Sequence, residues 1–187
     1  MVPIVGLWVN LHGGFLGIIA CLGLLVAGTL VEQVLAVWGT DASPNYRPVA
    51  RYGLLFLACA LVTLVNPYGW HLHQHVASYL SSDWIRNNIQ EFLAPRFRSE
   101  SDAQFELLLF CGLVTVPWLL ARRQVVPALW ILFWGHNALT TVRHIALFGI
   151  VASPFIAQFF SELWTRATGT ASRASLLGIL RQLAADI

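Results

Sequence analysis

Two neighbouring side chains, Arg143 and His144, are the strongest chemical candidates in the sequence. They stand in a short polar connection between two apolar runs, where a solvated run of charges cannot explain them. The planar guanidinium group of arginine suits the oxygens of a phosphate, and a protonated histidine adds a second donor. The pair predicts a phosphate or anion site. The alternative is an arginine that reaches the membrane interface beside a buried histidine.

Glu91 is a carboxylate between two apolar residues, Ile89 and Phe92, in a polar stretch of the chain. In that position a carboxylate can act as an acid, as a base or as a ligand for a hydroxyl group. The alternative is an interfacial glutamate that pairs with Arg86 or Arg96. We expect at most an auxiliary catalytic role for Glu91.

Three further polar residues lie at breaks in the apolar pattern and are candidates for substrate binding. His12 precedes two glycines, which let a ligand approach the backbone closely or let two helices pack closely. Asn66 and Tyr68 belong to the turn sequence Asn-Pro-Tyr-Gly-Trp. That turn also suits a plain helix end with aromatic side chains at the membrane interface.

The alternating histidines His71, His73 and His75 raise the possibility of a metal site. On a helix the first and third share a face while the second points away from it. A catalytic zinc site needs three protein ligands and side chains that orient them, and no such orienting side chain is identifiable. We therefore favour a polar helix at the interface over a metal site, and no cofactor motif is identifiable.

The composition shows which kind of protein must position these residues. Of 187 residues, 57% are hydrophobic and only 11% are charged, whereas soluble domains carry about a quarter charged residues. A single soluble domain and a disordered chain are both excluded. A net charge of +2 does not favour a nucleic-acid partner. The sequence predicts an all-α, polytopic transmembrane helix bundle with the lipid bilayer as its partner.

A helix needs about 20 mostly apolar residues to cross the hydrocarbon core. This rule predicts a truncated first span over Met1–Val9 and five full spans, namely Phe15–Val37, Tyr52–Trp70, Phe105–Ala121, Gln124–Thr141 and Ile145–Phe160. The bundle is expected over residues 1–165, with an outer loop over about 67–104. Residues 166–187 are expected to form an amphipathic tail helix on the cytoplasmic surface. The short first span leads us to expect that upstream helices are missing.

The arginines predict the orientation, because cytoplasmic loops are enriched in basic residues. Alternating crossings place seven arginines on one side and four on the other, where five acidic residues accompany them. We assign the seven-arginine side to the cytoplasm. The C-terminus is then cytoplasmic, and the polar motifs face outward from the inner, or plasma, membrane.

Four segments also resemble, in order and spacing, motifs of a bacterial family of multi-pass proteins: LWVNLHGGFLGI, LVNPYGWHLHQHVASYL, IQEFLAPRF and TTVRHIALFGIVASP. That family is usually grouped with the lipid-linked-sugar glycosyltransferases of the GT-C fold. The resemblance runs from about Leu7 to Pro154. It implies a C-terminal portion of such a protein, because the first outer loop, which carries the principal catalytic carboxylate of GT-C enzymes, has no counterpart here.

The resemblance implies transfer of a sugar from a polyprenyl-phosphate donor on the outer face of the membrane. In that reaction Glu91 would assist the acceptor hydroxyl, and Arg143 and His144 would hold the phosphate of the departing lipid. Two other classes remain open. One is a transporter or channel component, although such proteins place their sites near the bilayer midplane and often contain internal repeats. The other is a structural membrane subunit without a ligand.

Overall fold

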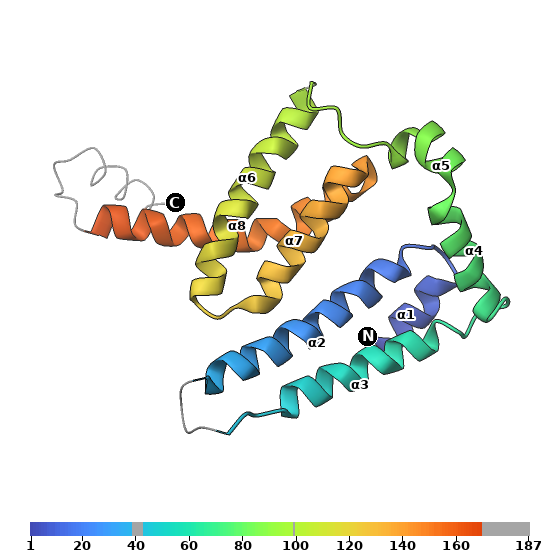
Figure 1. The fold of residues 1–187 in the computed structure, drawn as a ribbon, viewed down its shortest axis with the longest axis horizontal. Helices are drawn as coiled ribbons and strands as arrows, with labels where there is room; N and C mark the ends of the chain where they lie inside the picture. The colour runs from blue at the N-terminus through green and yellow to red at the C-terminus, as the bar shows by residue number, and fades with distance from the viewer. Residues whose placement is uncertain (39–42, 99, 170–187) are drawn as a thin grey trace.

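The computed structural model describes residues 1–38, 43–98 and 100–169, and all regular structure within these ranges is helical. Figure 1 shows the arrangement of the helices. In chain order they are α1 (Val2–Val9), α2 (Phe15–Val37), α3 (Arg47–Val62), α4 (Trp70–Ser81), α5 (Asp83–Asn88), η1 (Gln90–Phe92), α6 (Glu100–Ala121), α7 (Val125–Thr140), η2 (Val142–His144) and α8 (Ile145–Gly169). The tail helix expected over residues 166–187 lies largely outside the described residues, and α8 continues to Gly169.

Within the described ranges, three segments are long and apolar enough to cross a membrane. They are Phe15–Val37, Asp102–Ala121 and Val142–Gly169. Two of the five expected spans are shorter helices, because α3 and α7 have 16 residues each. The all-helical class is confirmed, and the count of five full spans is not.

The span expected over Tyr52–Trp70 does not form one helix. Instead α3 begins at Arg47 and ends at Val62. The amide of Asn66 donates to the carbonyl oxygens of Thr63 at 2.8 Å and Gly69 at 3.2 Å, and so closes a turn. Proline also disfavours helical geometry in the residue that precedes it. Gly69 then takes a φ of +52°, which favours glycine, and α4 starts in a new direction.

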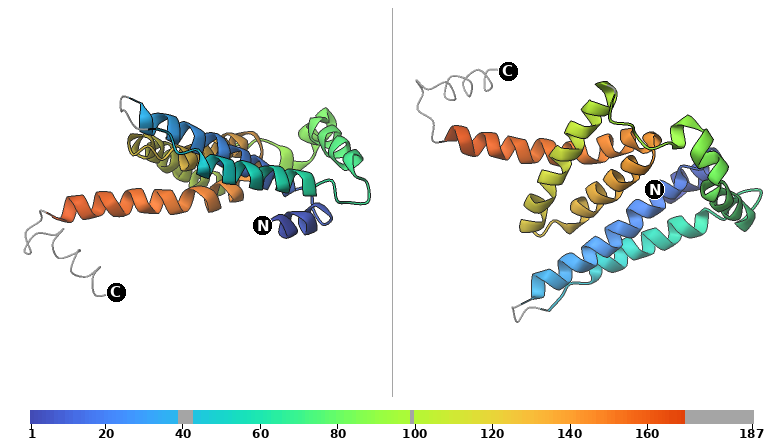
Figure 2. Two further views of the ribbon diagram at one scale, coloured as in Figure 1. Left: turned by 90° about the horizontal axis from the view of Figure 1, so that it is seen from below. Right: turned by 45° about the horizontal axis from the view of Figure 1, so that its top comes forward.

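The helices pack in two groups, α1 with α2 and α3, and α6 with α7 and α8. Contacts between α2 and α7 join the groups, as the views in Figures 1 and 2 show. At this contact the indole of Trp134 donates to the Cys21 sulfur at 3.2 Å. Farther along, one carboxylate oxygen of Glu32 accepts from the backbone N–H groups of Val125 at 2.7 Å and Val126 at 3.0 Å. Glu32 therefore caps the start of α7 from the neighbouring helix.

The polar segments singled out in the sequence gather at one end of the molecule. α1 and α3 end there, α2 begins there, and α7 ends there in η2. Figure 1 shows α4 and α5 running along this end, from the end of α3 toward the start of α6. We call this the loop end. The opposite end carries the turn between α6 and α7 and the second half of α8.

The close approach of α2 and α7 gives a direct test of the fold. A Cβ atom added at Gly28 would lie 2.9 Å from the Cα atom of Val126, whereas one added at Gly53 would meet nothing within 4 Å. Gly28→Ala should therefore destabilise the chain by about 1–3 kcal/mol. Gly53→Ala should be neutral or stabilising by up to about 1 kcal/mol, because alanine favours helix. Thermal unfolding in detergent measures both, and equal midpoints for the two variants would contradict this packing.

Candidate functional site

The structure brings two distant polar segments into contact at the loop end. The short helices η1 and η2 lie together, and the N–H group of Val142 donates to the carbonyl oxygen of Leu93 at 2.9 Å. As a result, the Arg143 Nη1 atom lies 3.7 Å from the Glu91 Oε1 atom. The strongest candidate cation and the candidate carboxylate of the sequence thus face each other.

The geometry of this ion pair leaves the arginine available to a ligand. Charge-assisted hydrogen bonds between nitrogen and oxygen are about 2.7–2.9 Å long, so a separation of 3.7 Å is a loose contact. The guanidinium carbon of Arg143 lies 4.7 Å from the ring centroid of Phe92, which holds the group by a cation–π contact. The Arg143 side chain is 31% exposed and that of Glu91 is 56% exposed. The Arg143 guanidinium is therefore partly open to an approaching anion.

His144 is held against the end of α7. Its Nδ1 atom lies 3.0 Å from the Thr141 hydroxyl oxygen and 3.4 Å from the Asn137 carbonyl oxygen. Its ring centroid lies 5.8 Å from that of Trp134. These contacts fix the imidazole through Nδ1 and make Nε2 the atom suited to meet a ligand.

A depression of about 390 Å³ adjoins the contact between η1 and η2. Leu93 and Val142, whose backbones are hydrogen bonded, form part of its wall. Its polar lining comes from Gln90, Arg96 and Asp102. It therefore offers both donors and acceptors next to the ion pair, as recognition of a hydroxyl-bearing ligand requires.

The other three candidates lie in the other helix group, where their polar atoms shape turns. The His12 Nδ1 atom accepts from the Gly14 N–H group at 2.9 Å. Asn66 closes the turn after α3 and accepts from the Tyr68 N–H group at 2.8 Å. Tyr68 itself is exposed. The structure thus brings Glu91 and Arg143 together, holds the adjacent His144 against the end of α7, and gives His12 and Asn66 local structural contacts.

The histidines of α4 also have local partners. The His73 Nε2 atom lies 2.9 Å from the Thr63 hydroxyl oxygen, and the ring stacks on Trp70 at 5.2 Å. The His71 Nδ1 atom lies 3.0 Å from the Gln74 Oε1 atom. Within the described ranges no group of three histidine, cysteine or acidic side chains is placed to hold a metal ion.

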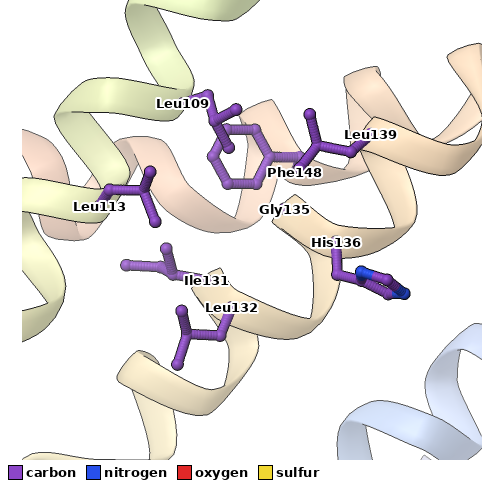
Figure 3. Close-up of a pocket in the computed structure, with 8 residues that line it drawn as sticks. All are labelled: Leu109, Leu113, Ile131, Leu132, Gly135, His136, Leu139 and Phe148. Atoms are coloured by element: carbon purple, nitrogen blue, oxygen red, sulfur yellow. The ribbon is translucent and has the colours of Figure 1, made fainter. Parts of the chain in front are cut away.

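Between α6, α7 and α8 lies a groove of about 200 Å³, shown in Figure 3. Its lining residues are Leu109, Leu113, Ile131, Leu132, Gly135, His136, Leu139 and Phe148. Figure 3 shows the Phe148 ring among the leucines, whereas His136 points away from it. Phe148 follows His144 by one helical turn, so this apolar groove begins next to the Arg143 segment.

Reasoning from the sequence missed three residues near this site. Phe92 is the direct neighbour of Glu91, but its contact with Arg143 is tertiary. Thr141 lies three residues before His144 and contacts it within the same turn. His136 carried a usable signal, because an ionisable side chain in an apolar helix is a functional candidate.

Comparisons of the chain with protein-family models, with curated proteins and with solved structures find no match. The residues at the loop end are therefore the basis for the function proposed below.

Proposed function

We propose that the chain is an integral membrane protein that binds a polyprenyl-phosphate-linked sugar at Glu91, Arg143 and His144, and that it contributes to sugar transfer as part of a GT-C-type glycosyltransferase. The observation that carries the proposal is the partly exposed Arg143 guanidinium, which is stacked on Phe92 and only loosely paired with Glu91.

The phosphate group of the proposed ligand is inferred from the guanidinium group of Arg143. Arginine presents several N–H donors in one plane and so can bind two phosphate oxygens at once. The cation–π contact with Phe92 restrains the guanidinium before the ligand arrives, which reduces the entropy lost on binding. His144 adds a donor from Nε2 when the Thr141 hydroxyl donates to Nδ1, because the ring proton then lies on Nε2.

The lipid component follows from the groove between α6, α7 and α8. Seven of the eight lining residues named above are apolar or glycine, and the groove starts one helical turn from His144. A ligand with a phosphate at Arg143 and a hydrocarbon chain in the groove would use both features. An isoprenoid phosphate has this combination of groups.

In the proposed sugar transfer, Glu91 has an auxiliary role. A carboxylate beside a bound phosphate can accept a proton from an acceptor hydroxyl group or orient it. The depression lined by Gln90, Arg96 and Asp102 offers that acceptor a polar approach. The principal catalytic carboxylate is assigned to another part of the enzyme.

The proposed orientation places the loop end outside the cell. Five arginines of the described residues lie toward the opposite end, namely Arg47, Arg51, Arg122, Arg123 and Arg166. By the positive-inside rule that end is cytoplasmic, in a bacterial inner membrane. The alternative of a transporter is less favoured, because its site would lie near the bilayer midplane, whereas Arg143 lies between the end of α7 and the start of α8.

The test compares ligands that differ only in the phosphate. The full chain in lipid nanodiscs is offered polyprenyl phosphate or the corresponding polyprenol at equal mole fraction, and retained ligand is measured by native mass spectrometry. A guanidinium contact to phosphate should favour the phosphate by about tenfold or more, because hydrogen bonds to charged groups contribute about 1.5–3 kcal/mol. Equal retention of the two lipids would refute the proposed site.

A further inference from the structure

A second cluster of charged and aromatic side chains lies at the end of the molecule opposite the candidate site. There Arg122 follows the last residue of α6, and its guanidinium carbon lies 4.2 Å from the ring centroid of Trp118. The same guanidinium forms an ion pair with Glu162 of α8. Arg166 of α8 pairs with the same carboxylate oxygen at 2.5 Å. We call Trp118, Arg122, Glu162 and Arg166 the arginine cluster.

The arginine cluster has a surplus of positive charge. Two guanidinium groups share one carboxylate, so the group carries a net charge of +1. Arg123 comes next in the chain, and its Nη1 atom donates to the Leu35 carbonyl oxygen at 2.8 Å, an uncharged partner. The side chain of Arg166 is 68% exposed, whereas that of Glu162 is 25% exposed. The Arg122 side chain is 34% exposed, so Arg166 is the cation that the cluster presents most to the surroundings.

The Arg122 guanidinium is fixed in place before any ligand binds. Trp118 packs edge-on against Phe159 of α8, with ring centroids 5.6 Å apart. The indole supports Arg122 from one side and Glu162 binds it from another. A side chain held in this way loses little rotamer freedom when it binds a second anion.

The depth of the cluster in a bilayer follows from helix lengths. The apolar segment of α6 ends at Ala121, directly before Arg122. The span Val142–Gly169 has 28 residues, which at 1.5 Å per residue is about 42 Å, longer than the hydrocarbon core of about 30 Å. In Figures 1 and 2 the second half of α8 projects beyond the other helices. With α6 and α8 across a membrane, the arginine cluster lies at the level of the lipid headgroups.

We propose that the arginine cluster binds the headgroup phosphate of an anionic phospholipid of the phosphatidylglycerol type. Basic side chains between transmembrane helices at the cytoplasmic surface are suited to such headgroups, and tryptophan favours the same depth. Exposed apolar side chains next to the cluster, Leu120 and Phe160, offer contacts for the acyl chains. The inference depends on the membrane location proposed above, and not on the polyprenyl-phosphate site.

The competing explanation is that the cluster is a staple, a set of ion pairs that only joins α6 to α8 and binds no lipid. Substitution of Glu162 distinguishes the two explanations. In a staple, loss of the carboxylate only weakens the helix contact, and the lipid has no influence. In a lipid site the carboxylate opposes the phosphate. Glu162→Gln should then destabilise the chain in neutral lipid and yet bind the anionic lipid more tightly.

The experiment uses the full chain in nanodiscs of phosphatidylcholine, with or without phosphatidylglycerol, and with inorganic phosphate added to the neutral discs as a further arm. The thermal unfolding midpoint and the phospholipids retained in native mass spectrometry are measured. We expect phosphatidylglycerol to raise the midpoint and inorganic phosphate to leave it unchanged. Arg166→Gln should reduce retention of phosphatidylglycerol by about fivefold. Arg51→Gln, a control on exposed Arg51 of α3, should retain it as the unchanged chain does.

The proposal is overturned if Arg166→Gln and Arg51→Gln lose the lipid equally, because the effect is then general surface charge. It is also overturned if Glu162→Gln reduces retention of phosphatidylglycerol, or if inorganic phosphate raises the midpoint as the lipid does. Retention of polyprenyl phosphate, measured in the same discs, reports on the loop end separately. A result against lipid binding at the arginine cluster can therefore be distinguished from a result against the proposed function.

Discussion

Replacing Arg143 by alanine should weaken binding of polyprenyl phosphate by about tenfold to a hundredfold, because it removes a charged donor worth about 1.5–3 kcal/mol. Replacing it by lysine should also weaken binding, by about tenfold, although the charge is kept. Lysine lacks the planar set of donors that binds two oxygens, and it loses the guanidinium contact with the Phe92 ring. Retention in nanodiscs by native mass spectrometry gives both values.

Arg86 provides the matched control for this prediction. It lies in α5 at the same loop end, is exposed, and pairs with Asp83 at 2.5 Å, so Arg86→Ala should leave retention unchanged. If Arg143→Lys retains polyprenyl phosphate as the unchanged chain does, while folding and insertion are normal, Arg143 is an interfacial anchor. The phosphate role would then be wrong.

Replacing Glu91 by glutamine should change binding and transfer in opposite directions. The carboxylate lies 3.7 Å from the Arg143 guanidinium and competes with the phosphate for it. Its neutralisation should tighten binding of polyprenyl phosphate by up to about fivefold, the range of an exposed ion pair. If the proposed function is right, sugar transfer should fall by about a hundredfold, because a proton-accepting group is lost.

Glu91→Asp separates charge from reach in this prediction. Aspartate keeps the negative charge on a shorter side chain. Glu91→Asp should therefore bind polyprenyl phosphate as weakly as the unchanged chain does, while sugar transfer falls. Unchanged transfer by Glu91→Gln would remove Glu91 from the mechanism. Weaker retention of polyprenyl phosphate by the same variant would show that the carboxylate supports the phosphate site instead of competing with it.

Much of the helix pattern could be predicted, since apolar runs and polar breaks are local features. The helix over Phe15–Val37 has the predicted bounds, because two glycines precede it. The prediction of one helix over Tyr52–Trp70 was wrong, because the apolar residues continue beyond Val62, whereas the helix ends there. The sequence placed Asn66 only in a turn at the end of the segment, whereas in the structure its side-chain amide closes the turn that follows α3.

The sequence identified the residues of the site but not the contact between them. Arg143, His144 and Glu91 stood out because polar groups between apolar runs are costly. Their pairing depends on the hydrogen bond between Val142 and Leu93, which joins two separate turns, and no periodicity encodes such a contact. The expected partners of Glu91 illustrate this point. Arg86 was considered because it is near in sequence, yet in the structure it pairs with Asp83.

The central claim is that the chain spans the membrane with the Glu91–Arg143 site on the outer face, and cysteine labelling in intact cells tests it most directly. Single cysteines are introduced as Asn87→Cys at the loop end and Ala167→Cys near the end of α8, in a chain whose three native cysteines are replaced by alanine. Both positions are exposed. An impermeant thiol reagent should label the first from outside, and the second only after the membrane is opened. Labelling of the second position alone in intact cells would invert the orientation, and labelling of both would contradict a membrane-spanning fold with a single outer site.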